Sequence, residues 1–219
     1  MKNWEKEIQQ LNFNSVLNCN VVGNTIFFGR YPQDEDGREK PIEWTVMKTE
    51  KNKMLLFSKY VLDTQQYNEK FEEITWETSD IRRWLNKEFY DTAFNNIERQ
   101  RVRKTLVETE DNPDYGTDGG NNTEDKVFLL SLEEVQKFFV TDEFEDLFPL
   151  TESDVELDNP DAAAKPTEYA KQLIVSAQNG TKYVKDFVDA DEKTGNSSWW
   201  LRTPGNSENQ AITVYDDIY

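Results

Sequence analysis

The chain has 219 residues, 13% of them aromatic, and a formal net charge of −18 at pH 7. This length suits one domain, and the high content of Phe, Tyr and Trp argues against disorder. The chain contains no run of eighteen apolar residues, so no membrane-spanning helix is predicted. The single cysteine, Cys19, excludes an intramolecular disulfide. The charged start contains no apolar signal region, so we expect a cytoplasmic protein.

The N-terminal region predicts a helical extension followed by one domain. Within residues 1–20, the segment 2–12 has helical periodicity, because three apolar residues share one of its faces: Trp4, Ile8 and Leu11. We place a single domain over residues 21–219.

The first strands of this domain are predicted by alternation. Residues 25–29 (TIFFG) predict a strand, and residues 41–62 predict a hairpin with its turn at 50–53. Three alternating residues mark the buried face of this hairpin: Ile42, Trp44 and Val46.

Helical periodicity then takes over. Thr78 or Ser79 can cap a helix, and its expected core stripe is Ile81, Trp84, Leu85 and Phe89. Asn95 and Glu98 have the spacing of a capping box, which predicts the start of a second helix.

The second half predicts further strands and helices. Residues 126–130 (KVFLL) predict a buried strand, and Ser131 with Glu134 predicts a capped helix directly after it. Residues 145–165 predict a loop and 166–180 a helix that ends at a glycine. The last segments, SWWLRT and AITVY, predict strands joined across PGNSEN, which makes the whole an α+β fold with antiparallel pairing.

The negative charge is concentrated in two segments. Residues 108–125 carry seven acids and residues 142–161 carry nine, and neither segment contains Lys or Arg. The expected acidic surface comprises Asp111, Asp114, Asp118, Glu143, Glu145 and Asp146. Such runs are most often solvated faces, and they disfavour direct binding of nucleic acid.

Chemistry-bearing motifs are few. The chain has no histidine and none of the standard nucleotide or zinc motifs, so we expect no enzymatic activity, no metal and no cofactor. Carboxylates in the loop over 111–125 could collect oxygen ligands for calcium, but their spacing does not follow the EF-hand pattern. The Gly and Asn content of this loop favours a flexible, solvated segment instead.

Aromatic and basic residues give the candidate binding site: Trp76, Arg82, Trp199, Trp200 and Arg202. On a strand, neighbouring side chains point to opposite faces, so at most one of the two adjacent tryptophans lies deep in the core. Trp200 and Arg202 share a face, because they lie two residues apart. A buried Arg202 would need a carboxylate partner, for which Asp125 is the candidate.

Six ordered motifs carry a family resemblance: IFFGRYPQ, PIEWTVM, LLFSKYVLD, TWETSDIRRWLNKEFY, DKVFLLSLEEV and WWLRTPG. Together they resemble a family of uncharacterised bacterial domains, which is itself similar to the C-type-lectin-like fold of the formylglycine-generating enzymes. The resemblance implies a mixed α+β fold in which a helix pair packs on twisted antiparallel strands. Cys19 precedes the first motif and the lectin calcium motifs are absent, so neither oxidase activity nor calcium-dependent sugar binding is implied.

Domains of this kind continue into a closing C-terminal strand near the point where Tyr219 ends this sequence. We therefore expect an open sheet edge that could pair with a partner or with a second copy to form a homodimer. The preferred function is a non-enzymatic module that presents loops and a sheet edge to a protein partner. The alternative is an acidic inhibitor, of the phage or mobile-element type, whose carboxylates mimic nucleic acid and block a basic cleft.

Overall fold

The computed structural model describes residues 21–139, 154–156, 164–173 and 195–215. The first sheet has the order β1-β2-β3 and is antiparallel throughout. Its strands are β1 (Thr25–Pro32), β2 (Glu39–Glu50) and β3 (Lys53–Ser58). Ile42, Trp44 and Val46 alternate inward along β2 and are buried, as predicted from the sequence.

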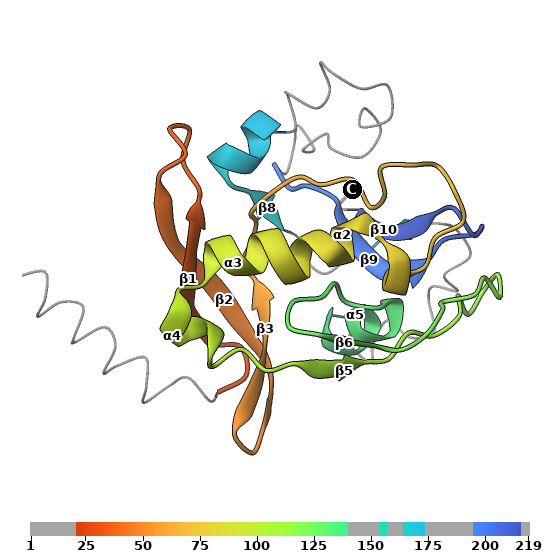
Figure 1. The fold of residues 1–219 in the computed structure, drawn as a ribbon, viewed down its shortest axis with the longest axis horizontal. Coiled ribbons are helices and arrows are strands. Elements are labelled where there is room, and N and C mark those ends of the chain that lie inside the picture. The colour runs from red at the N-terminus through yellow and green to blue at the C-terminus, as the bar shows by residue number, and fades with distance from the viewer. Residues whose placement is uncertain (1–20, 140–153, 157–163, 174–194, 216–219) are drawn as a thin grey trace, which may run out of the picture.

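A helical stretch covers this sheet and runs from beside β9 and β10 to β1 (Figure 1). It consists of η1 (Trp76–Thr78), α2 (Asp80–Trp84), the π-helical turn η2 (Leu85–Phe89), α3 (Tyr90–Ala93) and the single turn α4 (Asn96–Arg99). The Ser79 hydroxyl accepts a bond from the Arg82 backbone N–H, which confirms Ser79 as the cap of α2.

The other elements complete the α+β fold. They are β4 (Tyr60–Val61), β5 (Thr105–Val107), β6 (Thr123–Asp125), α5 (Leu132–Phe139), β7 (Asp154–Glu156), β8 (Lys165–Pro166), β9 (Trp199–Pro204) and β10 (Ala211–Tyr215). β9 and β10 form the predicted antiparallel pair, and β7 adds to β10 in parallel, inside the segment expected to be a loop. β5 pairs with β6 and β4 with β8, while residues 168–173 are helical, within the predicted helix over 166–180.

The core consists of two clusters of buried side chains. The larger cluster lies between the β1-β2-β3 sheet and the helical stretch. It includes Ile81, Leu85 and Phe89 of the predicted stripe, together with Trp76 of η1. The smaller joins α5 to β9 and β10 through Leu132, Val135, Phe139, Leu201 and Ile212. Partly buried side chains that pack against each cluster, among them Phe128 and Phe57, also line the cavity described below.

Gly29 is required where β1 passes close to α3. Its φ is +75°, and an added Cβ would lie 2.7 Å from the Ala93 carbonyl oxygen. Its N–H donates to Glu98 Oε1 at 3.1 Å, while Glu98 Oε2 accepts from the Asn95 N–H in the predicted capping box. The start of α4 is thereby tied to the first strand.

We expect Gly29→Ala to lower the free energy of unfolding by about 2–3 kcal/mol, because it adds a clash to an unfavourable φ. The matched control is Gly37→Ala, where φ is +69° but no atom lies within 4 Å of the added Cβ. That change should cost only about 1 kcal/mol. Equal losses for the two variants in urea titrations would show that the close approach at Gly29 does not matter.

Candidate functional site: a cleft beside an open strand edge

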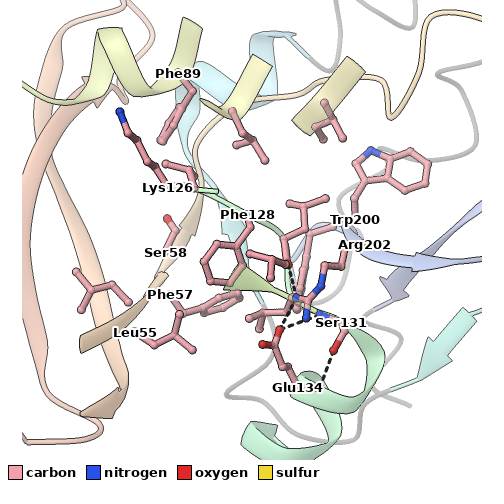
Figure 2. A pocket seen from close by; sticks show the side chains of 18 of the residues that line it. Leu55, Phe57, Ser58, Phe89, Lys126, Phe128, Ser131, Glu134, Trp200 and Arg202 are labelled. Carbon is pink, nitrogen blue, oxygen red and sulfur yellow. Dashed lines mark hydrogen bonds and ion pairs between the residues drawn. The ribbon is translucent and has the colours of Figure 1, made fainter. Parts of the chain in front are cut away.

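A cavity of about 1,710 Å³ lies between β3, the helical stretch, residues 126–131, α5 and β9. In Figure 2, Leu55 and Ser58 of β3 lie on one side of it and Trp200 with Arg202 on the other, with Phe128 between them. The cavity is therefore walled by elements from distant parts of the chain, and side chains that pack against either core cluster line it.

The edge of β3 faces this cavity. β3 pairs with β2 alone among the described strands, so it is an edge of its sheet. Each of its six residues, not every second one, lines the cavity. Because side chains alternate along a strand, a continuous run indicates that the cavity meets the strand edge as well as one face. The same continuity holds for residues 126–131 on the opposite wall.

The wall is predominantly aromatic and aliphatic. Phe57, Trp84, Phe89, Phe128 and Trp200 all contribute to it. Several of these rings are fixed by neighbours: Phe57 packs 5.2 Å from Trp199 and Trp84 packs 5.5 Å from Phe89, measured between ring centroids. The cleft thus offers rigid apolar area, which is typical of binding sites.

Residues 126–130 are not the strand that the sequence predicts. Side chains make most of the hydrogen bonds to their backbone: Asn86 Oδ1 accepts from the Lys126 N–H at 2.8 Å, and Asn86 Nδ2 donates to the Val127 carbonyl at 2.8 Å. Arg202 adds a bond from Nη1 to the Leu129 carbonyl at 2.8 Å. One backbone bond joins the segment to β9, from the Arg202 N–H to the Leu130 carbonyl at 2.9 Å. An apolar run predicts burial, but it does not reveal that side chains supply the other bonds.

Trp76, Arg82 and Asp125 form one buried network. The Asp125 carboxylate is 1% exposed and accepts from Arg82 Nη2 at 2.9 Å, from Arg82 Nε and from the Trp76 indole N–H at 3.1 Å. The Thr123 hydroxyl donates to the same carboxylate at 2.5 Å. Two predicted binding residues, the buried Trp76 and the partly exposed Arg82, therefore bond within the protein, where they join η1 and α2 to β6.

The expected Asp125–Arg202 pair is corrected by this arrangement. Arg202 is 4% exposed and pairs with Glu134 through Nη1 and Oε2 at 2.5 Å, while its Nε donates to the Glu108 carbonyl at 3.1 Å. Asp125 and Arg202 are both buried charges with a counter-ion, but each pairs with another residue than predicted: Asp125 pairs with Arg82, and Arg202 pairs with Glu134. Asp125 is the candidate from the sequence because it directly precedes the 126–130 segment. The residue that points to Arg202 is instead Glu134, whose carboxylate also accepts from the Ser131 N–H at the start of α5 (Figure 2).

Trp199 and Trp200 point to opposite sides of β9, as the alternation predicts. Trp199 packs against the α5 cluster, and Trp200 packs against the larger cluster and 5.5 Å from the Tyr67 ring. The Trp200 indole donates to the Gln65 carbonyl at 3.1 Å. Both rings are half-buried, so each contributes to packing, and both line the cleft.

The first acidic loop is fastened to the fold, contrary to the flexible loop that its composition suggests. Asn112 is buried, and its amide donates to the Pro204 carbonyl at 2.8 Å. Asp111 accepts from the Gly119 N–H and Asp118 from the Gly120 N–H, while the N–H of Asp114 donates to Asn112. Within the described ranges, no three carboxylate or thiol side chains converge as metal ligands.

Some predicted features lie outside the described residues. These are the helical extension over 1–20 with Cys19, and the acidic residues Glu143, Glu145 and Asp146. Of the second acidic segment, the structure describes only β7. Across the ranges that are described, no helix is both long and apolar enough to cross a membrane.

A polar corner of the cleft contains Asp63. Its carboxylate accepts from the Tyr31 hydroxyl at 2.5 Å and from the Thr64 N–H at 2.7 Å. Burial raises the pKa of Asp63, and burial together with this hydrogen bond raises the pKa of Tyr31. Burial likewise raises the pKa of Tyr67, which lies nearby on the cleft wall. The Tyr31–Asp63 bond joins the segment after β4 to β1.

A comparison with known proteins places the chain in a family. A family model described as "Domain of unknown function (DUF6273)" matches residues 51–218. The chain belongs to this family. The predicted membership of an uncharacterised domain family is thereby confirmed. No curated protein and no solved structure matches the chain.

The DUF6273 match begins at the turn before β3 and includes every wall of the cleft named above. Sequence reasoning missed most of these walls. The pattern predicts LLFS as one arm of a hairpin and KVFLL as a buried strand, and it does not single out Lys126. Two continuous apolar runs, rather than alternating ones, were the available signal that both segments face more than one side.

Proposed function

We propose that this DUF6273 chain is a non-enzymatic protein-binding module whose cleft takes an extended segment of a partner protein. The observation that carries this proposal is the open edge of β3, every residue of which lines an aromatic cavity. An edge strand presents unpaired N–H and C=O groups, and an incoming strand can satisfy them while its side chains enter pockets.

The apolar walls support a polypeptide that is apolar on at least one face. Leu55 and Phe57 of β3 and Phe128 opposite would contact alternate side chains of an added strand. The segment 60–71 also borders the cavity, so a loop contributes together with the sheet edge. This edge is β3 and not the C-terminal edge that we expect from the sequence, where β10 is paired with β7 on one side and with β9 on the other.

The relation to the C-type-lectin-like fold is part of the same proposal. It is supported by a helical stretch packed on an antiparallel sheet and by the late β9-β10 hairpin that carries the WWLRTPG motif. A binding role without catalysis fits that resemblance, since the motifs shared by this chain supply neither the cysteine nor the calcium chemistry of its better-known members.

Leu106 provides the test. It is 59% exposed on β5 and lines the cleft, whereas Ile97 on α4 is 68% exposed and does not. We expect a displayed library of random linear peptides, about ten residues long, to yield binders with alternating apolar residues. Leu106→Glu should weaken a selected peptide about tenfold, and Ile97→Glu should leave its affinity unchanged.

Methylation of alternate peptide nitrogens should also abolish binding, because it removes the N–H groups that would pair with β3. Failure to enrich any peptide, equal effects of the two Glu variants, or full binding by the methylated peptide would overturn the proposal. Concentration-dependent dimerisation that is blocked by Leu106→Glu would identify a second copy of this chain as the occupant and replace the partner protein.

The acidic-inhibitor alternative has one observation in its favour. Glu73 and Asp118 lie close enough to Glu208 for their negative charge to raise its pKa, with Glu73 the larger cause. Their clustering concentrates negative potential on one surface. An inhibitor of this kind should lose affinity for its target steeply between about 0.05 and 0.5 M salt, whereas the apolar cleft should lose little.

A further inference from the structure

We infer that the segment docked in the cleft carries an acidic side chain that pairs with Lys126, an inference that rests on the proposed function. Lys126 is half-buried and lines the cleft. Its ammonium lies 4.0 Å from the centroid of the Tyr90 ring, which offsets part of its lost hydration. The bond from its N–H to Asn86 fixes the position of its backbone.

The carboxylates adjacent to Lys126 in the sequence are committed elsewhere. Asp125 pairs with Arg82, and Glu124 pairs with Lys104 Nζ at 2.7 Å. Asp91, one residue beyond Tyr90, pairs with Arg99 at 2.7 Å. Lys126 forms no ion pair with any residue in the described part of the chain, although the whole chain carries 43 acids against 25 bases.

An acidic residue of the docked segment would complete this site. A cation against an apolar wall is poorly hydrated, so a carboxylate brought beside it interacts more strongly than it would on an open surface. The net charge of −18 repels heavily acidic partners, so the complementary occupant has one Asp or Glu within an otherwise apolar stretch. The pairing fixes register and direction, which an edge strand alone specifies weakly.

The experiment uses the peptides selected from the library on the full chain. We expect an Asp or Glu at a constant position among the alternating apolar residues. The most enriched peptide is then synthesised with Glu, Gln or Lys at that position, and its affinity is measured by titration calorimetry. The native protein should prefer the Glu peptide over the Gln peptide by about tenfold.

Variants of two lysines isolate the pair. Lys126→Met should bind the Glu and Gln peptides equally, and Lys126→Glu should prefer the Lys peptide. The control is Lys104→Met, whose lysine is exposed outside this cleft and which should retain the tenfold preference. Matching thermal melts will show that the variants remain folded.

The outcomes separate the two proposals. Apolar peptides that bind without a constant acidic residue, or equal binding of the Glu and Gln peptides to the native protein, would overturn the role of Lys126 and leave the cleft as a docking site. Failure to enrich any peptide would overturn the docking site and the pairing with it.

Discussion

Replacing Asp125 by alanine is expected to lower the free energy of unfolding by about 3–5 kcal/mol. The change removes the carboxylate partner of the Arg82 guanidinium and one of the two acceptors of the fully buried Trp76 indole, which keeps its bond to the Thr123 hydroxyl. A buried donor that loses its partner keeps the cost of desolvation without the compensating bond. The loss should be visible in urea titrations and as a lower melting temperature.

Two further variants make this result decisive. Asp125→Asn keeps an acceptor but not the charge, so its loss should be smaller, about 2 kcal/mol. Glu124→Ala removes the exposed pair with Lys104 on the neighbouring residue and should cost less than about 1 kcal/mol. Should Asp125→Ala cost no more than Glu124→Ala, the network would not be the brace between α2 and β6 described above.

Replacing Arg202 by methionine is expected to cost about 3 kcal/mol and to weaken peptide binding in the cleft. The guanidinium holds the Leu129 and Glu108 carbonyls and neutralises Glu134. Its loss removes the donor of these two carbonyls and leaves the Glu134 carboxylate with the Ser131 N–H but without its counter-ion. Residues 126–130 form no strand, and the Arg202 backbone N–H still donates to the Leu130 carbonyl at 2.9 Å, so release of the Leu129 carbonyl should loosen this wall of the cleft without detaching it. Methionine preserves most of the side-chain volume, which separates lost bonding from a cavity.

A double-mutant cycle tests the assignment of Glu134 as the partner. The combined change Arg202→Met and Glu134→Leu should cost less than the sum of the single changes, by about 1–3 kcal/mol, because no unpaired charge remains. Arg99→Met, which removes the pair with the exposed Asp91 carboxylate, is the control and should cost less than about 1 kcal/mol. Strict additivity would argue against the Arg202–Glu134 pair.

Local patterns predicted local structure well in this protein. Ser79 caps α2, the Asn95–Glu98 box starts α4, and the Ser131–Glu134 box starts α5, since each bond joins residues within one turn. Alternation likewise identified the buried face of β2 and the opposite orientations of Trp199 and Trp200. In each case the interacting groups are neighbours in the sequence, so spacing alone specifies the geometry.

The sequence by itself therefore determined the α+β class, the helix caps, the inward faces of the strands and the need of buried charges for counter-ions. Only the tertiary structure decided that Arg82 neutralises Asp125, that Glu134 neutralises Arg202, and that β3 and residues 126–131 face one cleft. The reason is distance along the chain: the two ion pairs join residues 43 and 68 positions apart. Among many carboxylates, burial requires a partner for each arginine, but the packing of the elements selects which one.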